Sequence, residues 1–117
     1  MKKVAIIGGR DFDQKEFLFE KVLSIVQNHH VSLIISGGAK GADTLAKQFA
    51  LHHEIPFQEY LPQYHLYPGK IAPLKRNEQI VNACDILVAF PCCNSKGTWH
   101  TLSLARQQKK DIYIFKC

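Results

Sequence analysis

Two kinds of apolar pattern alternate along the whole chain, and this alternation limits the possible folds more than any other feature. Runs of consecutive apolar residues are typical of buried strands, whereas apolar residues that recur every three or four positions are typical of helices. The strand-like runs cover residues 4–8, 31–36, 56–61, 85–90 and 112–116, and helical patterns fill the intervals between them. This strand-helix order predicts an α/β fold with a parallel sheet and helices packed on it.

The predicted topology is a doubly wound, five-stranded sheet with strand order 3-2-1-4-5 and helices on both faces. Right-handed crossovers and short connections favour this order, in which the chain reverses direction between the first and fourth strands. With 117 residues, 46% of them hydrophobic, residues 1–117 suit a single domain and leave no room for a second. The pattern Asp13-x-x-Glu16 predicts a capped first helix, and Pro73 predicts the start of the third.

No apolar run approaches the length of a membrane span, and the N-terminal segment reaches glycine at Gly8, too early for a signal peptide. We therefore expect a soluble, cytoplasmic protein with no membrane partner. Its cysteines, Cys84, Cys92, Cys93 and Cys117, are expected to be free thiols. Their spacing matches no familiar zinc site, so we predict neither a metal nor a cofactor.

Three glycine-bearing loops follow predicted strands whose carboxyl ends meet at the switch point, where ligands bind in this class of sheet. They span residues 8–13, 36–43 and 91–98, and they carry the cations Arg10, Lys40 and Lys96. Glycine lets backbone N–H groups approach a ligand, and the helix that follows each loop adds unpaired donors and a positive dipole end. The loops therefore predict a phosphate or nucleotide pocket, although each glycine could also serve turn geometry alone.

Familiar nucleotide motifs are absent. The chain contains neither Gly-x-Gly-x-x-Gly nor the Walker pattern, which argues against ordinary NAD binding and ATP hydrolysis. Ser36 lies outside any Gly-x-Ser-x-Gly motif, so we expect it to form hydrogen bonds within its turn rather than to act as a nucleophile.

Four motifs, in this order, resemble the SLOG superfamily: residues 8–12 (GGRDF), 36–43 (SGGAKGAD), 75–77 (KRN), and 89–91 (AFP) with Gly97-Thr98. This superfamily groups the LOG cytokinin-activating phosphoribohydrolases with the Rossmann domain of DNA-processing protein A. The chain resembles most the small stand-alone YspA/YpsA-related proteins, from Lys3 to about Phe115. The resemblance implies a Rossmann-like domain that binds a nucleotide or nucleotide-derived small molecule, in a family tied to nucleotide signalling.

The residues expected to bind this ligand come from the three loops and from the motif around Arg76. They are Gly8, Gly9, Arg10, Ser36, Gly37, Gly38, Ala39, Lys40, Gly41, Asp43, Arg76, Asn77, Pro91, Gly97 and Thr98.

The LOG resemblance fails at the catalytic carboxylate. In LOG enzymes the last motif binds phosphate and supplies a glutamate for cleaving the N-glycosidic bond. Here Thr101 occupies the position of that glutamate, and Cys92-Cys93 replace a glycine pair. The resemblance therefore implies ligand binding, sensing or sequestration rather than catalysis, through a partner or a homo-oligomer. If the chain is nevertheless a phosphoribohydrolase, Arg76 and Asp43 are the residues expected to take part.

Two other hypotheses and several residue roles stay open at this point. A phosphoribohydrolase would need a carboxylate beside the ribose, and Asp11, Asp13 and Asp43 are the pocket candidates. Binding of single-stranded nucleic acid needs a continuous positive groove with stacking aromatics, which the scattered lysines of this +5 chain do not favour. Asp43 either caps its helix or contacts the ligand, and Tyr64 and Tyr67 either stack on a base or pack on the protein.

Trp99 and His100 follow the last glycine loop, close enough to the predicted pocket to touch a ligand. Packing in the core or an oligomer contact would explain either residue equally well.

Overall fold

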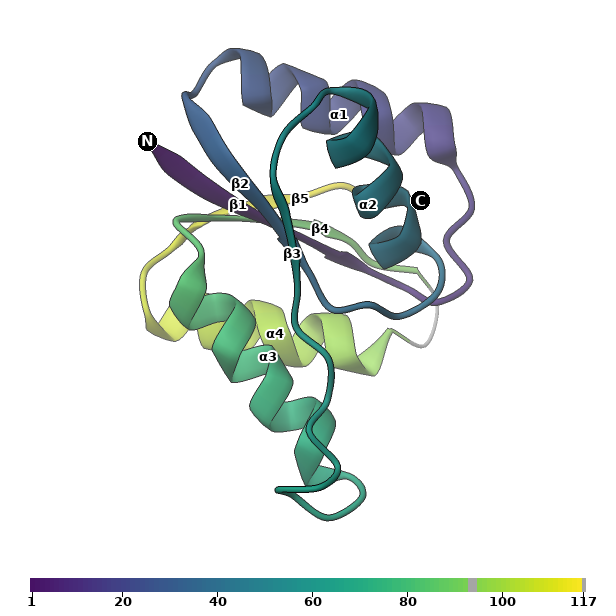
Figure 1. Cartoon of the computed structure of the whole chain (residues 1–117), viewed down its shortest axis with the longest axis vertical. Helices are drawn as coiled ribbons and strands as arrows, with labels where there is room; N and C mark the ends of the chain where they lie inside the picture. Colours follow the sequence, from purple (N-terminus) through teal and green to yellow (C-terminus); the bar gives the residue numbers. More distant parts are fainter. Residues whose placement is uncertain (93–94, 117) are drawn as a thin grey trace.

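A computed structural model describes residues 1–92 and 95–116 of the chain. All strands of the five-stranded sheet run parallel, in the order β3-β2-β1-β4-β5 (Figure 1). This confirms the predicted fold class and strand order. The strands are β1 (Lys2–Gly8), β2 (Val31–Ser36), β3 (Phe57–Glu59), β4 (Ile86–Phe90) and β5 (Asp111–Ile114). The helices are α1 (Lys15–Gln27), α2 (Ala42–His52), α3 (Ile71–Ala83) and α4 (Lys96–Gln107).

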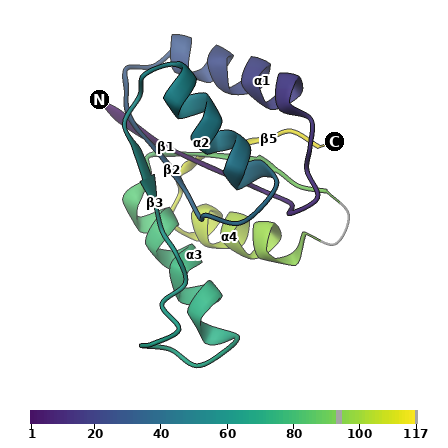
Figure 2. The same ribbon diagram turned by 45° about the vertical axis from the view of Figure 1, so that its right-hand side comes forward.

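The sheet lies between two layers of helices, α1 with α2 on one face and α3 with α4 on the other (Figures 1 and 2). Leu18, Val22 and Phe49 pack against one face, whereas Ile80 and Leu102 pack against the other. β1 and β4 are central, and all five residues of β4 are buried. Strands buried on both faces read as continuous apolar runs, which is why these two strands were visible in the sequence.

The boundaries of two helices differ from the prediction. α1 begins at Lys15 with Gln14 as its N-cap and without a side-chain capping bond, so the predicted Asp13 cap is wrong. Instead, the backbone carbonyl of Asp13 accepts a hydrogen bond from the Lys15 N–H at 3.0 Å. α3 begins at Ile71, two residues before Pro73. Proline is tolerated there because the first-turn N–H groups have no partner within the helix.

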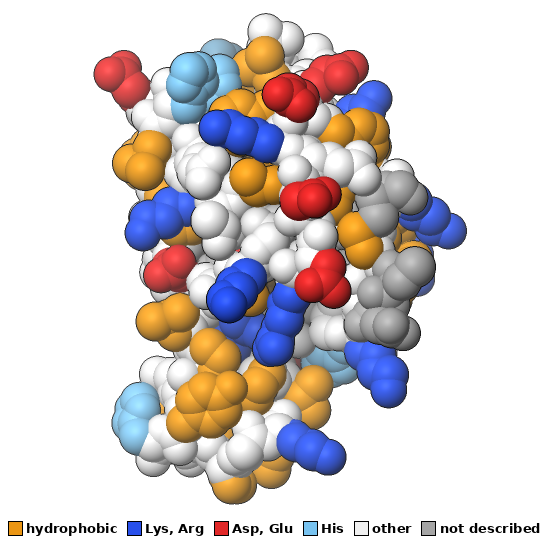
Figure 3. Space-filling model, turned by 90° about the vertical axis from the view of Figure 1, so that its right-hand side faces the viewer, with side chains coloured by type: hydrophobic (Ala, Val, Ile, Leu, Met, Phe, Trp, Pro, Cys, Tyr) orange, Lys and Arg blue, Asp and Glu red, His pale blue; other side chains and the backbone are white. Residues whose placement is uncertain are grey.

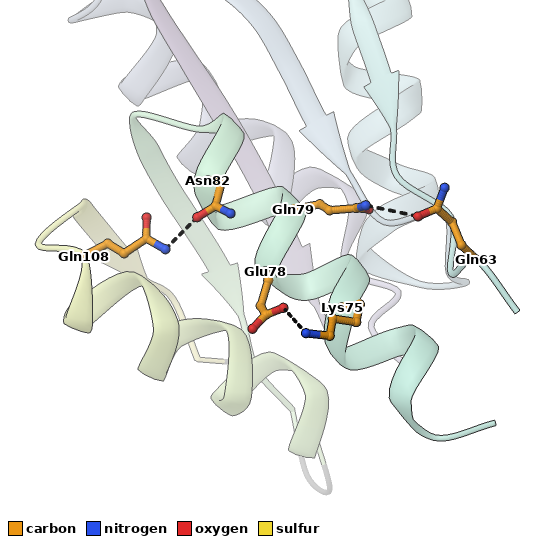
Figure 4. Close-up of polar contacts among 6 residues, drawn as sticks. All are labelled: Gln63, Lys75, Glu78, Gln79, Asn82 and Gln108. Carbon is orange, nitrogen blue, oxygen red and sulfur yellow. Dashed lines mark hydrogen bonds and ion pairs between the residues drawn. The ribbon is translucent and has the colours of Figure 1, made fainter. Parts of the chain in front are cut away.

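Polar contacts hold α3 against its neighbours, which matters because α3 carries Arg76 (Figure 4). Gln79 donates a hydrogen bond to Gln63 of the β3–α3 loop at 3.1 Å. Three residues further along α3, Asn82 accepts a hydrogen bond of 2.7 Å from Gln108, the residue after α4. The helix is therefore tied to a loop on one side and to α4 on the other.

The cysteines correct one expectation. Cys84 is a buried free thiol, and burial raises its pKa to about 11. Cys92 is disulfide-bonded, so the expectation of free thiols is wrong for this residue. That expectation rested on the expected cytoplasmic location and on the spacing of the cysteines in the sequence. Neither of these shows which sulfur atoms lie close together in the folded protein. Cys93 and Cys117 lie outside the described residues.

Among the described helices, we find none whose length and apolar character would let it cross a bilayer.

Candidate functional site

A cavity of about 400 Å³ opens at the carboxyl edge of the sheet, between the loops that follow β1 and β4, the loop that follows β2, and α3. It lies at the topological switch between β1 and β4, where ligands bind in doubly wound sheets. Ten residues of the predicted set line it: Gly8, Gly9, Arg10, Gly37, Ala39, Asp43, Arg76, Asn77, Gly97 and Thr98. The structure therefore brings together, around one cavity, residues that are up to 90 positions apart in the sequence.

The other predicted residues do not line the cavity: Ser36, Gly38, Lys40, Gly41 and Pro91. Ser36 is fully buried, and the turn itself requires Gly41. Gly41 has a φ of 75°, and an added Cβ would clash with the backbone carbonyl groups of Gly9 and Arg10. Both reasons exclude an L side chain at this position, so the turn geometry alone accounts for this glycine.

A buried hydrogen-bond network shapes the β2–α2 loop. Ser36 Oγ lies 2.7 Å from the carbonyl oxygen of Ile6 in β1 and 2.8 Å from Asp43 Oδ1 in α2. Asp43 Oδ2 accepts a hydrogen bond from the Ala39 N–H at 3.0 Å. Asp43 thus ties the loop that precedes its helix, while Gly41 occupies the N-cap position without a side-chain bond. The structure supports an architectural role for Asp43 and Ser36 at the base of the cavity.

Asp43 is 7% exposed, and this burial raises the pKa of its carboxyl group above the ordinary value of 3.8. The hydrogen bonds from Ser36 and Ala39 and the charge of Arg76 act in the opposite direction, and Glu59 reinforces the increase. Burial disfavours the charged form of a carboxyl group, and here this effect is the larger one.

Arg76 reaches from α3 across the cavity to the β2–α2 loop. Its Nη1 donates a hydrogen bond to the Gly37 carbonyl at 2.7 Å, and its Nε donates one to Asn77 Oδ1 at 2.9 Å. Asn77 is 6% exposed, and its amide nitrogen lies 3.3 Å from His100 Nδ1 in α4. Burial lowers the pKa of Arg76, which Asp43 and Tyr64 partly offset. The adjacent Asn77 and His100 therefore fix the direction of the guanidinium group.

The N-terminus of α4 forms the opposite wall. Gly97 is exposed, and an added Cβ would meet no atom within 4 Å. Thr101, at the position of the LOG glutamate, is 2% exposed and donates its hydroxyl to the Gly97 carbonyl at 2.9 Å. This wall offers backbone N–H groups and hydroxyl groups, and Thr101 cannot act as a carboxylate.

Sequence reasoning missed several lining residues, among them Ser95, Leu74 and Ile80. Ser95 precedes α4, and its Oγ accepts a hydrogen bond from the Cys92 N–H at 2.9 Å. A serine directly before a helix is a recognisable N-cap signal, which would have marked this position. Leu74 and Ile80 gave no such signal, because they fit the apolar stripe of any amphipathic helix.

Charged and apolar side chains surround the cavity mouth. Figure 3 views this edge of the sheet and shows Lys and Arg side chains in the lower half of the face, with hydrophobic side chains below them. Arg10 and Lys96 line the cavity and are exposed, and Lys40 is exposed on the β2–α2 loop. Tyr64 is 62% exposed, whereas Tyr67 is half-buried, with Lys75 Nζ 6.0 Å from its ring. Of the two tyrosines, Tyr64 is the one available to a ligand.

A metal site was not predicted, and none of the described residues form a group of three or more His, Cys, Asp or Glu side chains that would hold an ion. Cys93, one of the residues considered as a ligand, lies outside the described part of the chain.

Comparison with models of known protein families identifies the family to which this chain belongs. The model of the YspA, cpYpsA-related SLOG family (YAcAr) matches residues 2–67, more than half of the chain. The chain belongs to this SLOG family. The matched segment contains the β1 and β2 loops, whereas α3 and the α4 wall lie beyond it.

A curated relative of this SLOG protein comes from a virus of bacteria. The Gene 61 protein of Mycobacterium phage D29 is 28% identical over 113 residues, which cover 92% of this chain and 90% of the phage protein. The two chains therefore correspond over almost their whole length.

Two solved structures share the fold of the SLOG protein. DNA processing protein A (DprA) of Streptococcus pneumoniae aligns with a TM-score of 0.78 and 22% identity, covering 97% of this chain and 50% of DprA. DprA of Helicobacter pylori, described for its mode of binding single-stranded DNA, aligns with a TM-score of 0.76 and 22% identity over 97% of this chain and 64% of DprA. The chain thus spans about half to two thirds of these structures, which share its Rossmann-like architecture.

Proposed function

We propose that the protein binds a nucleotide or nucleotide-derived small molecule in the cavity, and that it acts by sensing or sequestering this molecule. The observation that carries the proposal is the position of Arg76. Its guanidinium group lines the cavity, and within the described residues no carboxylate lies within ion-pair distance of it. Two of its five N–H donors are used by Gly37 and Asn77, so others are left for a phosphate.

The size and walls of the cavity support a small ligand. A volume of about 400 Å³ falls in the range of small-molecule sites. The α4 N-terminus supplies backbone N–H groups at a dipole end that favours anions, and the open side of Gly97 lets a phosphate approach them. Arg76 and this helix end would thus hold an anionic group from two sides.

Catalysis is the alternative with less support. A phosphoribohydrolase needs a carboxylate near the scissile bond, but Thr101 stands at the family position. Of the two carboxylates that line the cavity, Asp43 has both oxygen atoms engaged by Ser36 and Ala39, and Asp11 is exposed. We therefore expect binding without turnover.

Single-stranded nucleic acid is the second candidate ligand, and one observation favours it. Leu61, Tyr64, Leu66, Ile71 and Leu74 are all exposed on the β3–α3 loop and the first turns of α3. Tyr64 lies near enough to Arg76 to affect its pKa. Aromatic side chains beside cations provide stacking surfaces for bases. The fold is also shared with H. pylori DprA, a protein that binds single-stranded DNA.

A thermal-shift screen tests both candidates with one protein preparation. The panel contains mononucleotides, ADP-ribose derivatives, cyclic dinucleotides and oligo-dT, each also tested against Arg76→Ala. A ligand at 100 times its dissociation constant adds about 2.7 kcal/mol to the free energy of unfolding. A steep loss of oligo-dT binding with added salt would favour nucleic acid. No shift with any member of the panel, and no ligand released from the purified protein, would refute the proposed function.

Signal output through a partner or a homo-oligomer, and a cytoplasmic location, remain predictions. Sedimentation with and without the ligand, and cell fractionation, would check them.

A further inference from the structure

Three oxygen atoms lie in a row beneath the cavity. Ser36 Oγ is in the middle, 2.7 Å from the Ile6 carbonyl oxygen and 2.8 Å from Asp43 Oδ1. At these distances each contact is expected to hold its own hydrogen atom, because one hydroxyl hydrogen cannot point directly at both partners. The Ser36 hydroxyl supplies one and the Ile6 carbonyl supplies none. The Asp43 carboxyl group is the source that remains for the second.

We propose that Asp43 is a neutral carboxylic acid in the ligand-free protein, with its proton on Oδ1, and that this proton gives the cavity its preference for an anion. Asp43 Oδ1 donates to Ser36 Oγ, and Ser36 in turn donates to the Ile6 carbonyl. Asp43 Oδ2 carries no proton and accepts the Ala39 N–H at 3.0 Å. The role assigned to the proton rests on the proposed function, whereas its position rests on the three oxygen atoms alone.

The surroundings of Asp43 agree with a neutral group. The side chain is 7% exposed, and burial of this extent raises the pKa of a carboxyl group. Glu59, from β3, acts in the same direction, whereas the Ala39 N–H and Arg76, from α3, act in the opposite direction. Ser36 lowers the pKa only if its hydroxyl hydrogen points at Asp43 and not at the Ile6 carbonyl. Arg10 and Asp11 of the β1–α1 loop line the same cavity, and Lys40 lies exposed in the loop of Asp43 itself.

Arg76 gives independent geometric support. Its guanidinium group and the Asp43 carboxyl flank Gly37, because a Cβ built on Gly37 would lie 2.8 Å from Arg76 Nη1 and 3.1 Å from Asp43 Oδ2. Even so, the two groups form no ion pair, and Arg76 Nη1 donates to the Gly37 carbonyl instead. An ionised aspartate this close to an arginine would be expected to pair with it. A neutral one leaves the positive charge of Arg76 for the ligand.

The proton can be detected without any ligand. Carboxyl carbon NMR of protein labelled at aspartate follows each titration, and the signal missing from Asp43→Asn identifies Asp43. We expect the Asp43 signal at neutral pH to be that of the protonated acid, in line with the raised pKa of this group. An Asp43 signal that is already that of the carboxylate at neutral pH would overturn the proposal. The measurement uses the wild-type protein, so the result stands even if Asp43→Asn folds poorly and the signal must be assigned by other means.

The role of the proton is tested with sulfate, whose charge is constant over the titration. Sulfate affinity is measured by NMR below and above the Asp43 midpoint. We expect wild-type affinity to fall at least about five-fold at the higher pH, the factor for one added unit charge a few ångströms away under water-like screening. Asp43→Asn, which mimics the neutral acid, should show no such fall. Asp111→Asn removes an exposed carboxylate at the start of β5, outside the cavity lining, and should keep the wild-type ratio.

The outcomes separate this inference from the proposed function. A wild-type affinity that is equal at both pH values would overturn the role of the proton. An Asp43 that is still protonated at neutral pH, without sulfate binding at either pH, would uphold the proton on Oδ1 and count against the anion-binding function.

Discussion

Replacing Gly97 with alanine should stabilise the empty protein and weaken ligand binding. The glycine is the second residue of α4, and an added Cβ would meet no atom within 4 Å. No packing requirement therefore explains it, and alanine is favoured over glycine in helices by about 0.5–1 kcal/mol. Because the residue lies in the first turn, we expect a gain of about 0.5 kcal/mol or less in the free energy of unfolding.

The effect on the ligand has the opposite sign. Gly97 lines the cavity, so we expect the new methyl group to occupy space through which a phosphate would approach the N-terminal N–H groups of α4. Forcing a methyl group into an occupied space costs about 1–3 kcal/mol, and each 1.4 kcal/mol is a ten-fold change in affinity. We therefore expect the dissociation constant of the nucleotide found by screening to rise about five-fold to one-hundred-fold, as measured by calorimetry.

A control variant and two possible results test this prediction. Ser103→Ala changes an exposed residue of the same helix, away from the cavity lining, and should leave the dissociation constant unchanged. If Gly97→Ala binds as tightly as the wild type, the ligand does not approach the N-terminus of α4. If Gly97→Ala is less stable than the wild type in urea unfolding, the space beside Gly97 is not open, and the reasoning fails at its first step.

Three further predictions concern Arg76, Thr101 and Asp43. Arg76→Ala should weaken nucleotide binding about ten-fold or more in calorimetry and lower stability in urea by about 1.5–3 kcal/mol, because charge-assisted hydrogen bonds are lost. Arg76→Lys should restore only part of the binding, since an ammonium group lacks the planar fork. Chromatography should show AMP hydrolysis at background, because Thr101 supplies no carboxylate; adenine release abolished by Asp43→Asn would contradict this. The free energy of unfolding should fall as pH rises through the folded-state pKa of Asp43. The reason is that, below this pKa, the folded state holds a proton that the unfolded state loses near 3.8. Urea unfolding of Asp43→Asn should show a smaller change of this free energy with pH.

Much of the fold could be predicted because burial leaves a direct trace in the sequence. β4 is buried along its entire length, so its residues form an unbroken apolar run. Elements held by tertiary contacts were harder to delimit. β3 has only three residues, Phe57–Glu59, and its run in the sequence extends well beyond them. The capping motif at Asp13 also gave a wrong helix start. The chain enters α1 one residue later than the motif predicts, with Gln14 at the N-cap position, and helix ends of this kind are the least certain part of a sequence-based assignment.

The positions of the candidate site that depend on backbone geometry could be predicted from the sequence. Those that depend on contacts between side chains of different elements could not. The glycine loops could be placed at the switch point from topology alone, since parallel strands bring their carboxyl ends to one edge. The contact of Asn77 with His100 joins two helices, and no spacing rule within one helix reports it.

The same distinction separates Ser36 from Gly97, two members of one predicted set of residues. Ser36 and Gly41 serve the empty protein, since one is fully buried in a hydrogen-bond network and the other is confined by backbone atoms. Gly97 and Arg76 lie in the cavity, and the open side of Gly97 and the remaining donors of Arg76 have no evident use without a ligand. A family motif does not distinguish these two kinds of residue, but the space and donors around each one do. The strongest test of function is therefore a pair of variants, one from each kind: Gly41→Ala should lose stability before it loses binding, and Gly97→Ala should lose binding while it keeps stability.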